Sequence, residues 1–367
     1  MAEDDGRMPK RIKDYKIVET LGRGGMGEVF LATHQQLDRP VAIKRYAPAP
    51  GTKDDKKNRE RFLREGRALA KLHHQGIVGI YDYFEQRGQL YMVLEYVEGF
   101  QVGKLIEGGP LSLDVACIIG FKLADALEHA HFHRIIHRDI KTSNVMVSRD
   151  GQVKLMDFGI ARGEVLERIT QTGLLVGTPA YFPPEVIAGH EASELSDIYG
   201  MGAVLYHCLS GRKLFFQVDD KSLYKAILAG KFVRLQKVVR GIPRGLRNIV
   251  HKCLAKKPEE RYQSAADLRQ TLDLFMAGQC MWTNHAERLA GFLQAAEHLQ
   301  EPPLTSIDIS VSDLLVKSTP VRRPGTGRGI KWIVFGTLAI ALAGLIWFAW
   351  ENGWIERVLQ TMGPGGG

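Results

Sequence analysis

Short alternating hydrophobic runs between residues 15 and 97 predict β-strands, and one stretch within them follows a helical period instead. In residues 59–72, the apolar side chains Phe62, Leu69 and Leu72 recur at helical spacing. The hydrophobic segments that come later in the chain are longer and predict helices. Strands followed by helices predict an α+β fold, with a small β-rich lobe and a larger α-rich lobe.

The pattern changes again between residues 277 and 329. One amphipathic helix is expected there, over residues 286–299. Its apolar face consists of Leu289, Phe292, Leu293 and Ala296. The rest of this interval is basic and rich in proline, serine and threonine, and this composition is typical of a flexible tether.

Nineteen residues without a charge, Trp332 to Trp350, follow the tether. At 1.5 Å per residue, a helix of this length spans roughly the 30 Å hydrocarbon layer of a bilayer. The alternative is a buried core helix, but a core helix normally keeps a polar stripe. Tryptophans at both ends favour a bilayer interface. We therefore expect one C-terminal transmembrane helix.

Charge sets the expected orientation of this helix. Five basic residues precede it closely, whereas Arg357 is the single basic residue among the seventeen that follow. The five are Lys317, Arg322, Arg323, Arg328 and Lys331. The expected location is the cell (inner) membrane, as a single-pass protein with its long N-terminal part in the cytoplasm.

Composition excludes several classes of protein. The 367 residues are 45% hydrophobic, which is enough for a buried core and excludes a wholly disordered chain. The 49 basic and 41 acidic residues give a net charge of +8, part of it local to the tether, so nucleic-acid binding is not expected. The four cysteines are far apart, without metal-ligand spacing, and predict reduced thiols. The charged first fifteen residues lack the apolar run of a secretory signal.

A glycine-rich segment, L-G-R-G-G-M-G-E-V, runs from Leu21 to Val29 and contains Gly22, Gly24 and Gly27. Glycines permit a tight turn and let backbone N–H groups approach phosphate oxygens. By itself the segment is also compatible with a plain hairpin turn. A dinucleotide-binding fingerprint needs a helix after the glycines, and a Walker A loop needs Gly-Lys-Ser/Thr; both are missing, because strand-like segments follow.

The motifs that follow in order carry more weight. They are V-A-I-K ending at Lys44, Glu65 within the predicted helix, H-R-D-I-K-T-S-N over 137–144 and D-F-G over 157–159. This series resembles the protein kinases, over about residues 15–275. It is most similar to bacterial serine/threonine kinases of the eukaryotic-like family that are tethered by one transmembrane helix.

The resemblance implies a role for each motif residue. Lys44 would hold the α- and β-phosphates of ATP and be held by Glu65. Asp139 would orient the substrate hydroxyl and accept its proton, and Lys141 would contact the γ-phosphate. Asn144 and Asp157 would bind Mg²⁺, with Mn²⁺ as an alternative ion, since hard oxygen ligands suit such ions.

The resemblance also implies an adenine site. Val29, Ala42 and Met146 would enclose the base, the backbone of Glu95 and Val97 would bind its polar edge, and Leu94 would be the gatekeeper. The glycine-rich segment would cover the nucleotide through Leu21, Gly22, Gly24, Gly27 and Val29. Stacking across the lobes is implied for Leu69, Ile80, His137 and Phe158.

Structural and regulatory roles follow from the same resemblance. Asp197 is expected as a structural polar residue, and Glu185 and Arg261 as a buried ion pair. Thr170 and Thr172 match threonines that related bacterial kinases phosphorylate on themselves. Arg138 could then pair with a phosphothreonine and order the segment; two exposed threonines without consequence are the alternative.

The expected organisation is an N-terminal extension (1–14), a kinase domain (15–275), a juxtamembrane linker (276–329), a transmembrane helix (330–350) and a short extracytoplasmic tail (351–367). Its expected partners are ATP, protein substrates and the membrane. A homodimer is a further hypothesis, without a motif that supports it. The rival from another class is a membrane-anchored pseudokinase scaffold, which would lack Lys44, Asp139 or Asp157. A small-molecule kinase is disfavoured by the P-P-E segment at 183–185.

Overall fold

The computed structural model describes residues 9–24, 27–46, 55–158, 179–216, 220–279, 281 and 284–297. The contacts divide the chain into two units, 1–316 and 317–367, and every described residue lies in the first. The expected transmembrane helix and tail therefore lie outside the described residues. Within the described part, no helix is both long and apolar enough to cross a bilayer.

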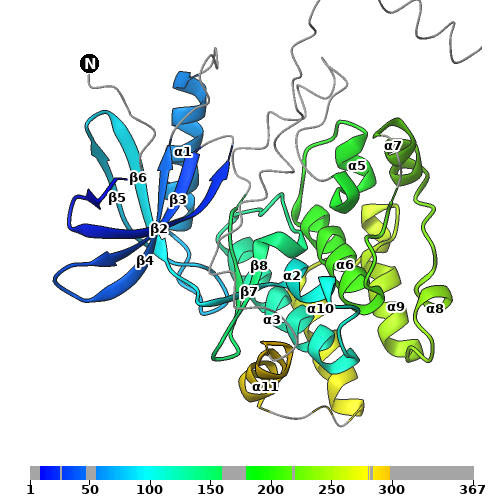
Figure 1. The fold of residues 1–367 in the computed structure, drawn as a ribbon. Coiled ribbons are helices and arrows are strands. Elements are labelled where there is room, and N and C mark those ends of the chain that lie inside the picture. Colours follow the sequence, from blue (N-terminus) through cyan, green and yellow to red (C-terminus); the bar gives the residue numbers. More distant parts are fainter. Residues whose placement is uncertain are drawn as a thin grey trace, which may run out of the picture. The chain divides into compact units, whose positions relative to one another are not determined.

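The predicted β-rich lobe is an antiparallel sheet with the strand order β1-β2-β3-β4-β6-β5 (Figure 1). Its strands are β1 (Arg11–Ile12), β2 (Tyr15–Gly24), β3 (Gly27–His34), β4 (Arg39–Tyr46), β5 (Ile80–Gln86) and β6 (Gln89–Glu95). The helix α1 (Asp55–Leu69) belongs to this lobe. It begins four residues earlier and ends three residues earlier than the range 59–72 predicted from the apolar spacing.

The end of α1 explains why the predicted range was too long. Lys71 and Leu72 continue the chain with tight turns, in which their N–H groups donate to Ala68 O and Leu69 O at 3.1 and 3.0 Å. Leu72 is nevertheless buried, as are Phe62 and Leu69. The helical spacing therefore identified the buried residues correctly, although the last of them lies in a turn.

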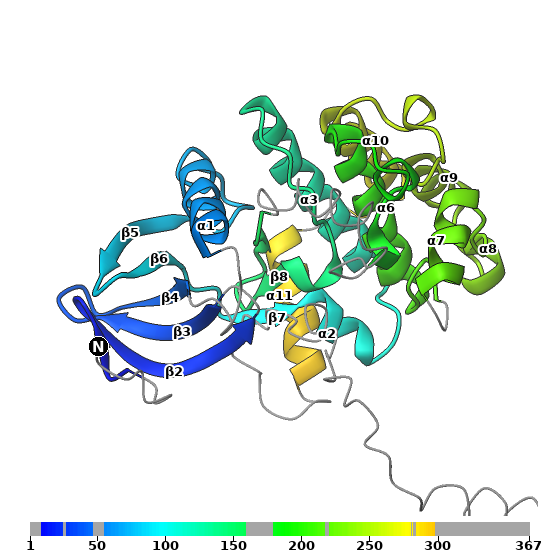
Figure 2. The ribbon, with the colours of Figure 1, turned by 90° about the horizontal axis from the view of Figure 1, so that it is seen from above.

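The second lobe is mainly helical, as predicted, and lies beside the sheet (Figure 2). It also contains a three-stranded sheet, β7 (Gly99–Gln101), β8 (Val145–Ser148) and β9 (Val153–Leu155). Its α-helices are α2 (Val102–Glu107), α3 (Leu113–Phe132), α5 (Pro184–Ile187), α6 (Glu194–Ser210), α7 (Asp220–Ala229), α8 (Leu235–Val238), α9 (Arg244–Cys253), α10 (Ala265–Gly278) and α11 (His285–Glu297). Short 3₁₀ turns are η1 (Thr142–Asn144), η3 (Pro179–Tyr181) and η4 (Pro258–Glu260).

The helix α11 confirms the amphipathic helix predicted in the 277–329 interval. Leu289 and Leu293 are fully buried, and Arg288 forms an ion pair with Asp114 at the start of α3. Both ribbon views place α11 beside α3 and the small sheet (Figures 1 and 2). The helix thus belongs to the packed core of the second lobe.

A glycine in the turn between β8 and β9 permits the closest approach of α11. Gly151 has φ +80°, and a Cβ at this position would lie 1.9 Å from the carbonyl oxygen of Ala286. Only a glycine combines this backbone conformation with such a close contact.

The buried cysteines agree with the expectation of reduced thiols. Cys117, Cys208 and Cys253 are free and buried in the helical lobe. Burial raises the pKa of each of these thiols to about 12. They are therefore unreactive side chains of the core.

Candidate active site

A cavity, partly open to solvent, lies where the two lobes meet. Its walls come from strands of the large sheet, from α1 and from the end of the small sheet. The lining residues are Val29, Lys44, Leu69, Val78, Leu94, Glu95, Val97, Met146, Met156 and Asp157. Five of the ten predicted ATP-binding residues, together with the predicted Leu94 and Asp157, therefore share one cavity.

Strand alternation explains why Lys44 faces this cavity. Along β4, Val41 and Ile43 pack in a hydrophobic cluster on one face of the sheet, while Ala42 packs in the main core on the other. Successive side chains of a strand point to opposite faces, so Lys44 shares the face of Ala42. Its Cα partners on the neighbouring strands are Val29 and Met92.

The glycine-rich segment forms the hairpin of β2 and β3. Gly22 pairs with Val29 and Gly24 with Gly27, and Gly27 has φ +150°. Residues 25 and 26 lie outside the described part. Leu21 and Ala42 are buried in the main core rather than among the residues that line the cavity.

One buried carboxylate holds the loop over residues 137–144. Asp197, in the first turn of α6, accepts hydrogen bonds from the backbone N–H groups of His137 and Arg138 at 2.8 Å each. The ring Nε2 of His131 lies 2.9 Å from the same carboxylate. A buried carboxylate is stable only when several donors satisfy it. Asp197 thus fixes the loop, which agrees with the structural role expected from the sequence.

His137 is fully buried, and its hydrogen bonds fix its tautomer. Its Nδ1 accepts the N–H of Asp139 at 3.2 Å, so its Nε2 carries the proton that is donated to Met156 O at 3.0 Å. Burial lowers the pKa of this imidazole, which favours the neutral form. Its ring centroid lies 4.5 Å from that of Phe158. Phe158 packs in the main core with Leu69 and the half-buried Ile80.

Two predicted catalytic residues, Asp139 and Lys141, and one predicted metal ligand, Asn144, meet within this loop. The side-chain amide of Asn144 donates to Asp139 twice, to its backbone O at 2.9 Å and to Oδ2 at 3.0 Å. Lys141 Nζ lies 3.5 Å from the same Oδ2, and both side chains are mostly buried. An amide and an ammonium group therefore both contact the Asp139 carboxylate.

Lys44 and Asp157 meet across the cavity. Lys44 Nζ donates to Asp157 Oδ1 at 3.2 Å, joining the large sheet to the segment after β9. Asp157 has φ +53° and Arg138 has φ +66°. Left-handed backbone at a residue other than glycine costs about 1–3 kcal/mol, and such strain is concentrated at functional sites.

The segment that joins the lobes is fixed by a residue that the sequence did not suggest. Lys154 Nζ, on β9, lies 2.6 Å from Glu95 Oε1, while Glu95 Oε2 accepts the N–H of Gly79 at 3.1 Å. Val78 and Met156 are further cavity residues that were not predicted. The alternation V-K-L over 153–155, next to D-F-G, was the signal that could have identified Lys154.

Some predicted residues cannot be placed. The backbone of Glu65 lies in α1, but its side chain is outside the described part, and so are Thr170 and Thr172. The pairing of Lys44 with Glu65 and the phosphorylation of the two threonines remain predictions.

The oxygen atoms of Asn144 and Asp157 suit Mg²⁺. Because Asn144 Nδ2 donates to Asp139, its amide oxygen is left as a ligand atom. Among the described residues, no group of three or more His, Cys, Asp or Glu side chains is arranged to hold a metal by itself. Mg²⁺ is commonly held by one or two protein oxygens together with substrate phosphates, and the donor set fits that pattern.

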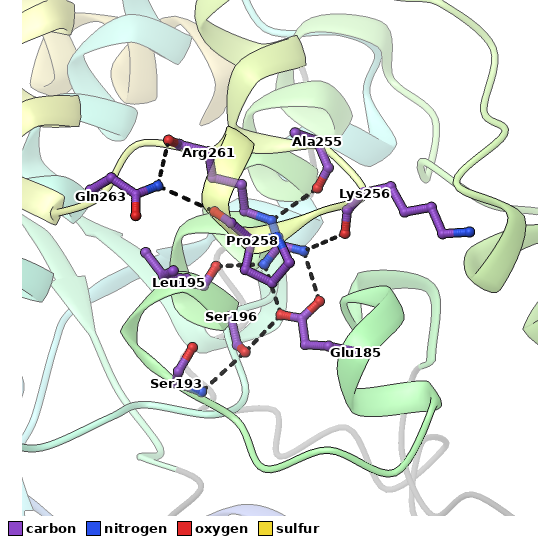
Figure 3. A network of polar contacts seen from close by, with 9 residues as sticks. All are labelled: Glu185, Ser193, Leu195, Ser196, Ala255, Lys256, Pro258, Arg261 and Gln263. Carbon is purple, nitrogen blue, oxygen red and sulfur yellow. Dashed lines mark hydrogen bonds and ion pairs between the residues drawn. The ribbon is translucent and has the colours of Figure 1, made fainter.

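The ion pair expected between Glu185 and Arg261 is confirmed (Figure 3). Arg261 Nη1 and Nη2 each donate to one carboxylate oxygen of Glu185 at 2.7 Å. The remaining guanidinium N–H groups donate to the carbonyl oxygens of Ala255, Leu195 and Lys256. All five N–H donors of the guanidinium group are thus satisfied.

Comparisons with known proteins agree with this geometry. The family model described as "Protein kinase domain" matches residues 15–272. The serine/threonine-protein kinase PknH of Mycobacterium bovis is 37% identical over 265 residues, which are 72% of this chain and 44% of the relative. The serine/threonine-protein kinase PrkC of Bacillus subtilis is 37% identical, over 71% of this chain and 40% of the relative. The chain spans less than half the length of these relatives.

A solved structure is similar over the same region. The crystal structure of the Mycobacterium tuberculosis PknI kinase domain superposes with a TM-score of 0.56 at 25% identity. The similarity covers 72% of this chain and 97% of that domain. The bilobal fold, the order of the motifs and the match over residues 15–272 together show that the chain belongs to the protein kinase family.

Proposed function

We propose that the protein transfers the γ-phosphate of ATP to serine and threonine hydroxyls of protein substrates. One observation carries the proposal. The Asn144 amide lies within hydrogen-bonding distance, and the Lys141 ammonium group within ion-pair distance, of the same oxygen, Asp139 Oδ2. Lys44 and Asp157 face the adjoining cavity as a second charged pair. The serine/threonine kinases among the similar proteins support the same activity.

The reaction needs positioning and charge neutralisation more than covalent help from the protein. The substrate hydroxyl oxygen would bond to the γ-phosphorus while the bond from that phosphorus to the β-phosphate oxygen breaks and ADP leaves. Asp139 would accept the hydroxyl proton. Lys141, whose Nζ is 3.5 Å from Asp139 Oδ2, would neutralise charge on the transferred group.

The phosphates would be held from both lobes. Lys44 would exchange its contact with Asp157 for the α- and β-phosphates, with Glu65 as its partner, while Asp157 and Asn144 would hold Mg²⁺. The ion, when bound, would neutralise phosphate charge. The adenine would lie between Val29 and Met146, which line the cavity, with Ala42 behind them and the backbone of Glu95 and Val97 at its polar edge.

Regulation and location extend the proposal. Autophosphorylation at Thr170 and Thr172 would supply phosphate groups for Arg138, and the apolar segment 330–350 would fix the chain in the cell membrane with the kinase domain in the cytoplasm. Both rest on the sequence motifs. The homodimer stays a hypothesis.

A direct assay tests the activity. The full chain, kept in detergent, is incubated with γ-labelled ATP, Mg²⁺ and a general protein substrate, and the phosphorylated amino acids are identified. We expect label on serine and threonine, and a loss of about 10²–10⁴-fold with Asp139→Asn. Asp38→Asn, in an exposed turn with φ +46°, is the matched control and should retain activity. Equal activity of Asp139→Asn and the control would contradict the assignment.

The pseudokinase scaffold predicts the opposite result. It would bind partners without transferring label. The presence of Lys44 and Asp157 at the cavity, and of Asp139 beside Asn144 and Lys141, does not favour it. Label on a small molecule but not on protein would instead favour a small-molecule kinase.

A further inference from the structure

A chain of three hydrogen-bonded side chains connects α6 and η3 to η1, the turn that directly follows Lys141 and is called the catalytic turn below. Tyr181 Oη lies 2.9 Å from Thr142 Oγ1 and 2.7 Å from His207 Nδ1. Thr142 belongs to η1, Tyr181 to η3 and His207 to the last turns of α6. Three elements that are distant in the sequence are therefore joined by two hydrogen bonds.

The Thr142–Tyr181 hydrogen bond is buried, and the Tyr181–His207 hydrogen bond is partly buried. Thr142 and Tyr181 are buried, and His207 is partly buried. Water competes poorly for hydrogen bonds in such surroundings, and a buried hydroxyl that loses its partner is costly. Gly103 of α2 adds to this enclosure, because a Cβ there would lie 3.3 Å from Thr142 Oγ1.

The imidazole is neutral at physiological pH. Burial, assisted by the charge of Lys213, lowers the pKa of His207 to about 4. A neutral ring can accept the Tyr181 hydroxyl proton at Nδ1, and Tyr181 then accepts from Thr142; the other tautomer reverses both bonds. Either direction keeps both hydrogen bonds intact.

The turn that carries Thr142 also carries the catalytic groups. Lys141 precedes Thr142 directly, and Asn144, two residues later, donates to Asp139. At the other end, Tyr181 immediately precedes the segment from Phe182 to α5, which contains Glu185 of the buried ion pair. The chain of hydrogen bonds thus links the segment around α5 to the turn that holds Asp139.

We propose that Thr142, Tyr181 and His207 are positioning residues, which set the placement of Asp139 and Asn144 from the segment 179–187 and from α6. The kinetic part of this inference rests on the proposed phosphotransfer function. Loss of either hydrogen bond should lower kcat for the protein substrate and leave the KM for ATP unchanged, because none of the three residues lines the nucleotide cavity.

The test is a set of near-isosteric variants in the full chain. Thr142→Val and Tyr181→Phe each remove hydroxyl contacts while keeping the shape, and we expect each to lower kcat about fivefold to tenfold. The double variant should cost no more than the worse single variant, because both break one chain. Thr142→Ser, which keeps the hydroxyl, should restore kcat.

A matched control lies on the same helix. Tyr206 is buried on α6, and its hydroxyl donates to Val233 O at 2.9 Å, without a contact to the catalytic turn. Tyr206→Phe removes one hydrogen bond of similar burial and should leave kcat unchanged. If Tyr206→Phe lowered kcat as much as Tyr181→Phe, or if Thr142→Ser were as damaging as Thr142→Val, the proposal would be wrong.

Hydrogen–deuterium exchange separates this proposal from the function itself. Amide exchange in residues 137–146 should rise severalfold in Thr142→Val and Tyr181→Phe, and not in Tyr206→Phe, whether or not the protein transfers phosphate. An inactive wild-type chain with this exchange pattern would overturn the function and support the link. Unchanged exchange in all three variants would overturn the link.

Discussion

Two charged pairs in this molecule have the same chemistry and different surroundings. Arg261 and Glu185 form a bidentate pair with side-chain exposures of 0% and 13%, and every guanidinium donor is satisfied within the protein. Lys44 and Asp157 form a single contact of 3.2 Å, with exposures of 15% and 25%, at the wall of a cavity. The first pair holds elements of the helical lobe together, and the second lies beside the cavity where we propose that ATP binds.

The difference lies in what each side chain can still bind. An arginine fork that uses all five donors is fixed, and removing its partner leaves a buried charge. A lysine beside a cavity can turn to a phosphate without disturbing the core. Charge alone therefore does not indicate a functional site. A charged pair that lies beside a cavity does.

The largest effect should come from breaking the fixed pair. Arg261→Met should lower the free energy of unfolding by about 3–5 kcal/mol, because Glu185 is left buried without its partner. Arg269→Met, at a half-exposed pair with Glu128, is the control and should cost about 1 kcal/mol or less. Chemical denaturation of the full chain measures both. Equal losses for the two variants would refute the contrast.

Lys44→Met should show the reverse behaviour. We expect phosphotransfer to fall by about 10²–10³-fold, since the variant removes a charge aimed at the phosphates, while the unfolding free energy changes by about 1 kcal/mol or less. Lys16→Met, on the exposed side of β2, should alter neither quantity. A large loss of stability in Lys44→Met would place Lys44 with Arg261 as a structural residue.

The docking of α11 gives a prediction of intermediate size. Leu289→Ala should cost about 3 kcal/mol of unfolding free energy, because it opens a cavity in a fully buried contact with the second lobe. Leu274→Ala, on the exposed side of α10, should cost less than about 0.5 kcal/mol. If both variants were equally stable, α11 would not belong to the folded core. Both variants are measured in the full chain, because a fragment that ends at residue 280 would lack α11.

The smallest expected effect concerns acid stability. The pKa of His207 is lowered to about 4 by burial, so between pH 6.5 and 4 the unfolded chain binds a proton that the folded chain does not. The contribution of His207 to stability is therefore complete above pH 6.5 and is lost as the pH falls toward 4. His207→Asn should flatten this part of the stability curve, measured by denaturation at pH 7, 5.5 and 4.5. An unchanged slope would contradict the assignment.

Motif order and strand alternation made much of the site predictable. Lys44 could be placed because V-A-I-K alternates along a strand, and the region around Asp139 because H-R-D-I-K-T-S-N is local in sequence. Lys154, Val78 and the hydrogen bonds of Thr142, Tyr181 and His207 were not predicted. They depend on contacts between distant elements, which no local pattern encodes.

Gly66 shows how tertiary packing changes the meaning of a residue. In the sequence it is a helix-weakening residue within α1, beside Glu65. In the structure it is buried, and a Cβ there would lie 3.0 Å from Met92 Cε. The glycine thus leaves room for the Met92 side chain beside α1, a reason that helix propensity does not contain.

The most direct test of the account is a calorimetric titration of the full chain with ATP, with and without Mg²⁺, for the wild type and for Asp157→Asn. The account predicts that the wild type binds ATP at a single site, and that Mg²⁺ tightens this binding. Asp157→Asn should lose the effect of Mg²⁺ and keep its fold, as measured by thermal unfolding. Absence of nucleotide binding in the wild type, or an equal effect of Mg²⁺ in both proteins, would contradict the central claim.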